Sequence, residues 1–430
     1  MKTEVLYKYS SSKLGVFYKI AFVLFAILTS CEKDETVYYE DLGEPFENPR
    51  YNTTQTISDE AQRNTIAFDA LGFMTGNFGS QTFLPPGKVA DYSGFQYFRD
   101  NDQTNLGHNT SFVTIIASNM LNLLTADQLD MFVEAANEQI DQINQYAIMR
   151  YPLCMAFRRL IDGDLPSGKT MLDIEAVKSY SADLYKLDGQ ISYNRAALFG
   201  KIIKTFSESQ VSELKELRSM EGVGNWPQNL PDKLKDLGLD KDVSVAVMTY
   251  ASEMYTWWAG SVTGDVYFCP ERQGTYFGSF YLKDWPAMGN PDYTIDEQLT
   301  ANAGQTFLNI LDQTQLSLVT GLVSEQKSSL LSIVETRGKV SEELRKFLKG
   351  SSASSSTVQT LSEQYGRYDG EIIYAYATAF AQVYKSMTQS QKDQLTALAD
   401  ALGYINPPGA FMYSEPVSLP SVANSDSFFK

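Results

Sequence analysis

The chain has 430 residues, of which 43% are hydrophobic and 13% aromatic, so it can bury one large core or two moderate ones. Its formal net charge of -17 gives a surface that repels phosphate backbones and anionic lipid headgroups. We therefore expect a globular protein that binds no nucleic acid and is not drawn to a membrane by its surface charge.

The first thirty residues have the pattern of an export signal. Four lysines precede an apolar run at residues 20–28, which is too short to span a bilayer but fits the apolar part of a signal peptide. Leu28-Thr29-Ser30-Cys31 resembles the lipobox of bacterial lipoproteins, which implies cleavage before Cys31 and lipidation of that residue. The acidic run that follows, EKDETVYYED, resembles the export signal that sends lipoproteins of the Bacteroidota to the cell surface.

These resemblances imply an outer-membrane lipoprotein at the cell surface or on the periplasmic face. Beyond residue 31 no stretch is apolar for 18 residues, so the N-terminal lipid would be the only contact with the membrane. Residues 31–56 are polar and are expected to form the lipidated tether. The remaining cysteines, Cys154 and Cys269, could form a disulfide or stay reduced.

Three blocks of sequence recur in the same order along the body of the chain. The matching ranges are 73–100 with 257–284, 124–163 with 311–350, and 187–193 (LDGQISY) with 368–374 (YDGEIIY). The spacing between the copies changes only from 184 to 187 to 181 residues, which small loop changes explain. Three collinear matches predict an internal duplication.

The predicted fold is mainly α, with two duplicated helical units of about 160 residues in a pseudo-two-fold arrangement. Each unit is expected to contain a first helix, an extended aromatic hairpin and four further helices. Pro152 lies within the third helix of the first unit and is expected to kink or break it. The expected segments are a signal peptide, the tether, repeat 1, a linker, repeat 2 and a C-terminal tail, at residues 1–30, 31–56, 57–220, 221–240, 241–402 and 403–430.

Four predicted helix starts share one signature, a capping residue followed three positions later by glutamine. The four pairs are Thr125 with Gln128, Ser207 with Gln210, Asp312 with Gln315, and Thr388 with Gln391. In such a capping box each side chain bonds the backbone N–H of the other residue. The first box reads LTADQ, which resembles the LTxxQ motif of the periplasmic chaperones related to Spy and CpxP. That resemblance would imply a chaperone-like function, although capping alone also explains the residues.

Charged residues fall on the apolar faces of the third and fourth helices of each unit. Arg150 and Arg337 lie on this face of the third helices, and Asp188 and Asp369 on that of the fourth. Because an isolated buried charge is costly, we predict two structural ion pairs, Arg150–Asp188 and Arg337–Asp369. The glycine after each aspartate would let the two helices approach closely. Alternatively, the two aspartates converge as paired carboxylates for a metal ion or proton transfer.

The aromatic hairpins contain the candidate ligand residues. Tyr, Phe and Trp are concentrated beside glycine and charge in DYSGFQYFRD and GTYFGSFYLKDW, where they either cover the helical core or line a cleft for a flat or sugar-like ligand. The lone histidine, at position 108, is either a catalytic base or a loop residue before a helix. The residues of the possible cleft are Tyr97, Asp100, His108, Tyr281, Asp284 and Trp285.

We expect no cofactor and no metal site, because the chain has one histidine, no clustered Cys and His, no P-loop and no G-x-S-x-G pattern. The favoured function is a lipid-anchored cell-envelope protein that binds a ligand, such as a glycan or peptide, or acts as a scaffold. Two alternatives stay open, a carboxylate-dependent hydrolase or metal enzyme and a periplasmic chaperone-like protein.

Overall fold

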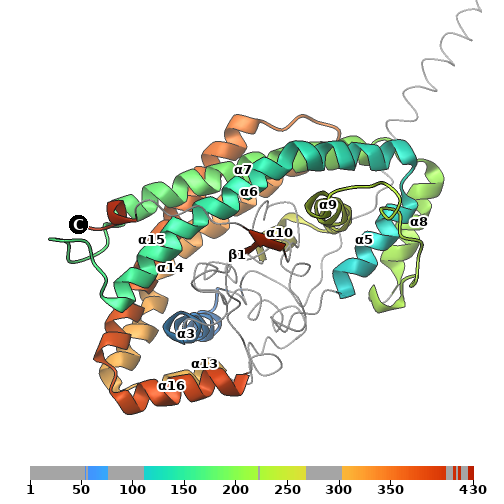
Figure 1. Ribbon diagram of the computed structural model, residues 1–430. Helices are drawn as coiled ribbons and strands as arrows, with labels where there is room; N and C mark the ends of the chain where they lie inside the picture. The colour runs from blue at the N-terminus through green and yellow to red at the C-terminus, as the bar shows by residue number, and fades with distance from the viewer. Residues whose placement is uncertain are drawn as a thin grey trace, which may run out of the picture.

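The computed structural model describes residues 54, 57–75, 111–220, 223–267, 303–402, 410–412, 415–417 and 425–430. In this part the protein is mainly α-helical, as the sequence predicts. Four long helices lie together through the middle of the molecule (Figure 1). They are α6 (Ala126–Asp162), α7 (Ile174–Ile203), α14 (Gln313–Leu344) and α15 (Ser355–Ser386).

The shorter helices form two groups at opposite ends of the long ones (Figure 1). One group contains α3 (Asp59–Thr75), α13 (Ala303–Ile310) and α16 (Gln389–Leu402). The other contains α5 (Ser111–Leu123), α8 (Glu208–Ser219) and α9 (Lys241–Ala259), and α10 (Val262–Tyr267) follows α9 and packs on α14. The remaining elements are the 3-10 turns η2 (Val223–Asn225), η4 (Arg345–Phe347) and η5 (Asp426–Phe428) and the antiparallel strands β1 (Ala410–Met412) and β2 (Glu415–Val417).

The first helix of each predicted repeat packs against the other repeat. Helix α3 contacts α13, α14, α15 and α16, whereas α9 contacts α5, α6 and α7. Each end group therefore combines helices from both halves of the chain. The sequence did not predict this packing of α3 and α9 against the opposite half. An apolar helix face in the sequence does not indicate which helix it will pack against.

All four predicted capping boxes are confirmed, and their glutamines also join helices. At the start of α6, Thr125 N donates to Gln128 Oε1 at 2.9 Å and Gln128 N donates to Thr125 Oγ1 at 3.3 Å; α8, α14 and α16 begin in the same way. Gln210 Nε2 then donates to Gln128 Oε1 at 2.7 Å, and Gln391 Nε2 to Gln315 Oε1 at 2.7 Å. The LTADQ residues thus cap one helix and attach it to another.

Helix α6 continues through Pro152 without a break and reaches 37 residues. Pro152 therefore does not break the helix, and the alternative of a kink stays a prediction. A proline removes one backbone donor and crowds the preceding turn, which weakens the hydrogen bonds of the carbonyls there. One of these carbonyls, that of Met149, accepts a hydrogen bond from the Tyr180 hydroxyl at 2.8 Å. Packing against α7 thus supplies a partner at the weakened turn.

Helices α7 and α15 cross at very short range because glycines face the partner helix. A Cβ atom on Gly366 would overlap the backbone of Ser181, and one on Gly370 would lie 2.8 Å from the Cα of Lys178. A Cβ atom on Gly189 would overlap the side chain of Ser362. The partner of these glycines is therefore the fourth helix of the other half, and not the third helix of the same half as predicted.

Two polar contacts across this crossing form a reciprocal pair. Lys178 Nζ lies 3.0 Å from Glu371 Oε2, and Gln359 Nε2 donates to Gln190 Oε1 at 2.6 Å. Gln359 is the counterpart of Lys178, 181 positions later, and Gln190 is the counterpart of Glu371, 181 positions earlier. The two contacts therefore join the same two places of the repeat in opposite directions. Such reciprocity is what a pseudo-two-fold axis through the crossing requires, whereas the origin of the two halves by duplication stays a prediction.

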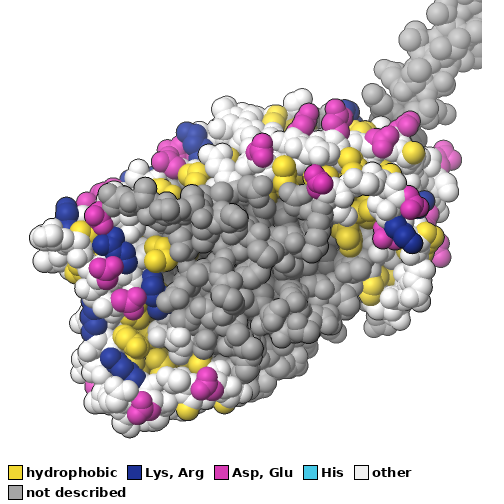
Figure 2. All heavy atoms as spheres, viewed as in Figure 1, with side chains coloured by type: hydrophobic (Ala, Val, Ile, Leu, Met, Phe, Trp, Pro, Cys, Tyr) yellow, Lys and Arg dark blue, Asp and Glu magenta, His cyan; other side chains and the backbone are white. Residues whose placement is uncertain are grey.

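The apolar side chains of both halves join in one continuous core, in which Trp257, Tyr146 and Tyr185 are fully buried. Within the described ranges, no helix combines the length and apolar character that a bilayer crossing requires. In the view of Figure 2, Asp and Glu side chains lie along the long helices at the upper edge of the molecule and around α8 at the right.

Candidate functional site

The residues predicted to line a ligand cleft all lie outside the part of the chain that the structure describes. They are Tyr97, Asp100, His108, Tyr281, Asp284 and Trp285. The same holds for the two aromatic hairpins, the lipobox residue Cys31 and Cys269. Their roles stay predictions.

The aspartates predicted to form ion pairs are fully buried in α7 and α15, where Asp188 and Asp369 each precede a glycine of the crossing. Arg337 is also buried, and its Nε donates to the backbone carbonyl of Asp265 at 2.8 Å. This bond directs the guanidinium towards α10, and its pairing with Asp369 stays a prediction. The side chain of Arg150 lies outside the description, so its pairing with Asp188 stays a prediction.

An ion pair that the sequence analysis missed joins α10 to η4. Arg345 Nε donates to Asp265 Oδ2 at 2.7 Å and Nη2 donates to Oδ1 at 2.9 Å, which is a bidentate arrangement. The Ser341 hydroxyl donates to the same carboxylate, and Arg345 Nη1 donates to the carbonyl of Trp257 at 2.9 Å. Both charged side chains are less than a tenth exposed. The pair therefore fastens α10 and the end of α9 to the end of α14.

The first half has an arginine at the corresponding place, 187 positions earlier, with a different partner. The Arg158 guanidinium lies 4.6 Å from the ring centre of Phe73, the counterpart of Trp257. Burial lowers the pKa of Arg158 to about 10, and the charge of Asp162 opposes this effect. An aromatic face thus contributes to stabilising the buried guanidinium of Arg158.

A second buried ion pair connects α7 with α9. Arg195 Nη1 lies 2.8 Å from Glu253 Oε2 and 3.0 Å from Oε1, and both side chains are fully buried. The guanidinium also lies 4.6 Å from the ring centre of Tyr250. Arg195 lies on the buried face of the fourth helix of the first half, and its partner comes from the first helix of the other half. A search for partners within one repeat could not find this pair.

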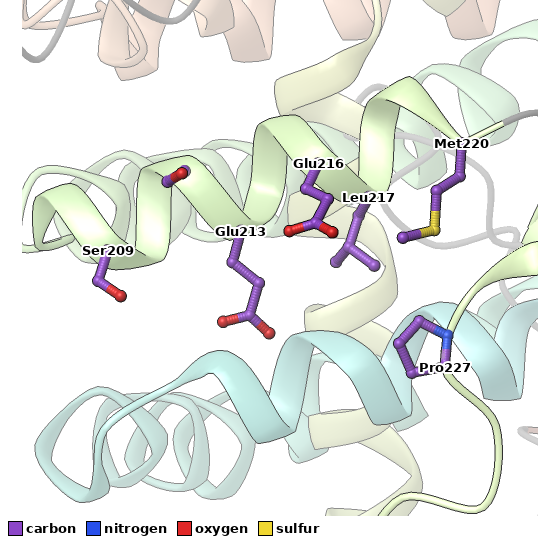
Figure 3. A pocket seen from close by; sticks show the side chains of 7 residues that line it. Ser209, Glu213, Glu216, Leu217, Met220 and Pro227 are labelled. Atoms are coloured by element: carbon purple, nitrogen blue, oxygen red, sulfur yellow. The ribbon is translucent and has the colours of Figure 1, made fainter.

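A groove lies beside α8, with a volume of about 360 Å³. It is lined by Ser209, Ser212, Glu213, Glu216, Leu217, Met220 and Pro227. Figure 3 shows the Glu213 and Glu216 carboxylates and the Leu217 side chain directed from α8 into this space, with Pro227 across from them. The groove therefore combines two carboxylates with an apolar floor.

The far wall of the groove is fixed by α5. Asn119 Nδ2 donates to the carbonyl of Pro227 at 3.0 Å, and Asn122 Nδ2 donates to that of Pro231 at 2.9 Å. Next to Pro227, the buried Trp226 ring packs edge-to-face on Tyr255 at 4.8 Å. These contacts hold the linker between the halves in one position, so the groove is preformed.

The lining of the groove suits a cation that carries an apolar stem, such as a lysine or arginine side chain, because its charge and its stem would each meet a matching surface. In α16 the counterparts of Glu213 and Glu216 are Gln394 and Ala397, so the second half lacks these carboxylates. Comparison with known proteins found no matching family model, no matching curated protein and no matching solved structure. The site is therefore interpreted from its own chemistry.

Proposed function

We propose that this protein is a lipid-anchored component of the bacterial cell envelope that binds a ligand or acts as a scaffold and does not catalyse a reaction. The lipobox at residues 28–31 and the acidic run after it support export and lipidation of Cys31. They also support an outer-membrane location, at the cell surface or on the periplasmic face. The ligand would be a glycan or a peptide.

One observation supports binding over catalysis, namely the enclosure of the buried ionic groups. Arg195 with Glu253 and Arg345 with Asp265 form close pairs whose side chains are 0–9% exposed. A catalytic acid or base must come within hydrogen-bonding distance of its substrate. These groups instead bond each other inside helix contacts, as structural charges do.

Among the described residues, the α8 groove is the surface that best fits a ligand. Its two carboxylates would attract the basic side chain of a peptide, and Leu217 with Met220 would pack against the stem of that side chain. The chaperone alternative instead requires an extended apolar surface. The large apolar side chains exposed in the described ranges, Met171, Leu237 and Leu331, lie on three separate segments.

The anchoring part of the proposal is tested by changing the lipobox cysteine. In cells that make the full chain, Cys31→Ala should abolish incorporation of labelled fatty acid and release the protein from the outer-membrane fraction. A matched Cys154→Ala variant should keep both properties. Equal membrane retention by the Cys31→Ala variant would contradict the proposal. Proteinase treatment of intact cells then separates the cell surface from the periplasmic face.

The binding part is tested by thermal stabilisation of the chain from residue 32 onward, because a ligand stabilises the state that it binds. The panel contains glycans, lysine-rich and acidic peptides, and divalent metal ions. We expect a lysine-rich peptide to raise Tm, and the Glu213→Gln/Glu216→Gln variant to lose this shift. Asp393→Asn on α16 is the matched control and should retain it. Stoichiometric metal with turnover would favour the enzyme alternative, and protection of unfolded proteins from aggregation would favour the chaperone.

A further inference from the structure

The last residues of the segment 425–430, after the 3-10 turn η5, pair with the turn between α6 and α7 as a short strand would. The carbonyl of Lys430 accepts hydrogen bonds from Thr170 N at 2.9 Å and Met171 N at 3.2 Å, and Lys430 N donates to the carbonyl of Met171 at 2.9 Å. Asp173 N donates to the carbonyl of Phe428 at 2.7 Å. The pairing is antiparallel and places Phe429 opposite the residue at position 172. The segment therefore bonds the turn through its backbone, independently of its side chains.

Two adjacent rings of this segment insert between the two helices. Phe428 meets the ring of Tyr180 on α7 edge-to-face, with 5.0 Å between the centres. Phe429 lies 5.3 Å below the guanidinium of Arg159 on α6. Each phenylalanine is only 3% exposed, so both have dedicated pockets.

Arg159 is the polar centre of this contact. Its Nη1 donates to Asp426 Oδ1 at 2.7 Å and to Ser425 Oγ at 2.8 Å. Its Nε lies 3.1 Å from Asp164 Oδ2, a residue of the turn itself. The guanidinium thus bonds a carboxylate of the turn and the carboxylate of the segment at the same time.

The docking edge belongs to a connection that is longer in the first half than in the second. Both α6 and α14 lead to a glycine with positive φ, Gly163 and Gly350. Helix α7 begins 11 positions after the first glycine, whereas α15 begins 5 positions after the second. The backbone groups at 170–173 that pair with the segment therefore lie in a connection that is six residues longer than its counterpart in the second half. Long connections of this kind are where binding sites commonly lie.

We propose that the 164–173 turn, the end of α6 and the start of α7 form a peptide-binding groove, and that residues 425–430 are its intramolecular ligand. The groove accepts a peptide with an acidic residue, one intervening position and then two aromatic residues, which forms a 3-10 turn from the acidic residue to the first aromatic residue and becomes extended at the second. Strand-like pairing gives such a site affinity, and side-chain pockets give it specificity. The site is separate from the α8 groove, which lies at the opposite end of the long helices (Figure 1).

The test uses the full chain with a protease recognition sequence placed between residues 417 and 425 and cut after folding. A labelled Ser-Asp-Ser-Phe-Phe-Lys peptide is then titrated by fluorescence anisotropy. We expect the cut chain to exchange its own segment for the peptide and to bind it saturably. The uncut chain should bind at least about tenfold more weakly, because its own segment competes at high effective concentration.

Variants sharpen the assignment. Replacing both phenylalanines of the peptide with alanine should weaken binding by about 30-fold or more, since each ring loses a buried pocket. Arg159→Ala in the cut chain should weaken binding by about tenfold, and Lys346→Ala, at the corresponding place in the second half, should not change it.

Three outcomes would overturn the proposal. The cut chain could unfold, or it could hold its segment without exchange over days, and in both cases the segment would be an integral part of the core. Equal binding of the peptide by cut and uncut chains would place the peptide at another surface.

Discussion

Helices α6 and α14 share the hydrogen bonds at their starts but differ in the charge of their exposed faces. Each begins with a capping box whose glutamine bonds a second glutamine at 2.7 Å. Along the exposed face of α6 run Asp127, Asp130, Glu134, Glu138 and Asp141, and the same places in α14 are taken by Thr314, Ser317, Gly321, Glu325 and Ser328. None of the five acids of α6 forms an ion pair within the described part of the chain. The fold therefore depends on the glutamines, whereas the acids add surface charge.

The corresponding arginines Arg158 and Arg345 show the same principle inside the protein. Both are buried against an aromatic ring, at 4.6 Å from Phe73 and 5.9 Å from Trp257. Asp265 reaches Arg345 from α10 and binds it in a bidentate arrangement. The two buried arginines thus have different surroundings. We expect the stability of the second half to depend strongly on Asp265.

The largest expected effect comes from removing that acid. Asp265→Asn leaves the Arg345 charge buried without its counter-charge, so we expect a loss of about 3–5 kcal/mol in the free energy of unfolding. Asp162→Asn is the matched change in the first half, at an exposed carboxylate, and should cost under about 1 kcal/mol. Urea denaturation at neutral pH measures both variants. Equal losses would show that the halves neutralise their arginines in the same way.

The next effect concerns the helix crossing, where Gly366 occupies the place that Tyr185 has in the first half. Gly366→Ala would push a Cβ atom into the backbone of Ser181, and we expect a loss of about 3 kcal/mol because backbone cannot move aside cheaply. Gly321→Ala is the control, since nothing lies within 4 Å of its added Cβ. That change should stabilise by about 0.5–1 kcal/mol through helix propensity. Thermal unfolding compares them, and a neutral Gly366→Ala would mean that the crossing is loose.

Alkaline pH should weaken the packing of α9 but not that of α3, because α9 has the ionisable Tyr255 where α3 has Leu71. Burial raises the pKa of Tyr255 to about 12. This folded-state pKa lies above the unfolded value, so the stabilisation is complete below about pH 10 and is lost as pH rises through about 12. We expect Tyr255→Phe to remove up to about 2 kcal/mol of the loss of stability between pH 9 and 12. Unchanged pH dependence in the variant would show that Tyr255 ionises as freely as in the unfolded chain.

The smallest expected effect tests the similarity of the halves. Gln128→Ala and Gln315→Ala each remove a capping bond and a bond to the second glutamine, so both should cost about 1–2 kcal/mol. The two losses should agree within about 0.5 kcal/mol, because the contacts correspond one to one. Urea midpoints at constant slope measure them. A large difference would mean that one of the two glutamine pairs contributes little to the stability of the fold.

Sequence alone determined the local features of this protein. The helix class, the start of α9 at residue 241 and the four capping boxes follow from hydrophobic periodicity and from bonds between residues three positions apart. The glycines at 189 and 370 also predicted a close helix crossing. Such features depend on residues close together in the sequence, so they can be predicted without knowing which helix packs against them. The predicted cleft residues of the hairpins lie outside the described ranges.

Tertiary structure alone decided which elements meet. The exchange of α3 and α9 between the halves set the partner of Arg195, and the placement of α10 set that of Arg345. The glycines of the crossing face a helix other than the one expected, and Phe428 and Phe429 dock beside a connection that is longer in the first half than in the second. These contacts join residues far apart in the chain. Burial of apolar surface selects them, and that force has no direction, so the partner of a face is known only when all the helices have packed.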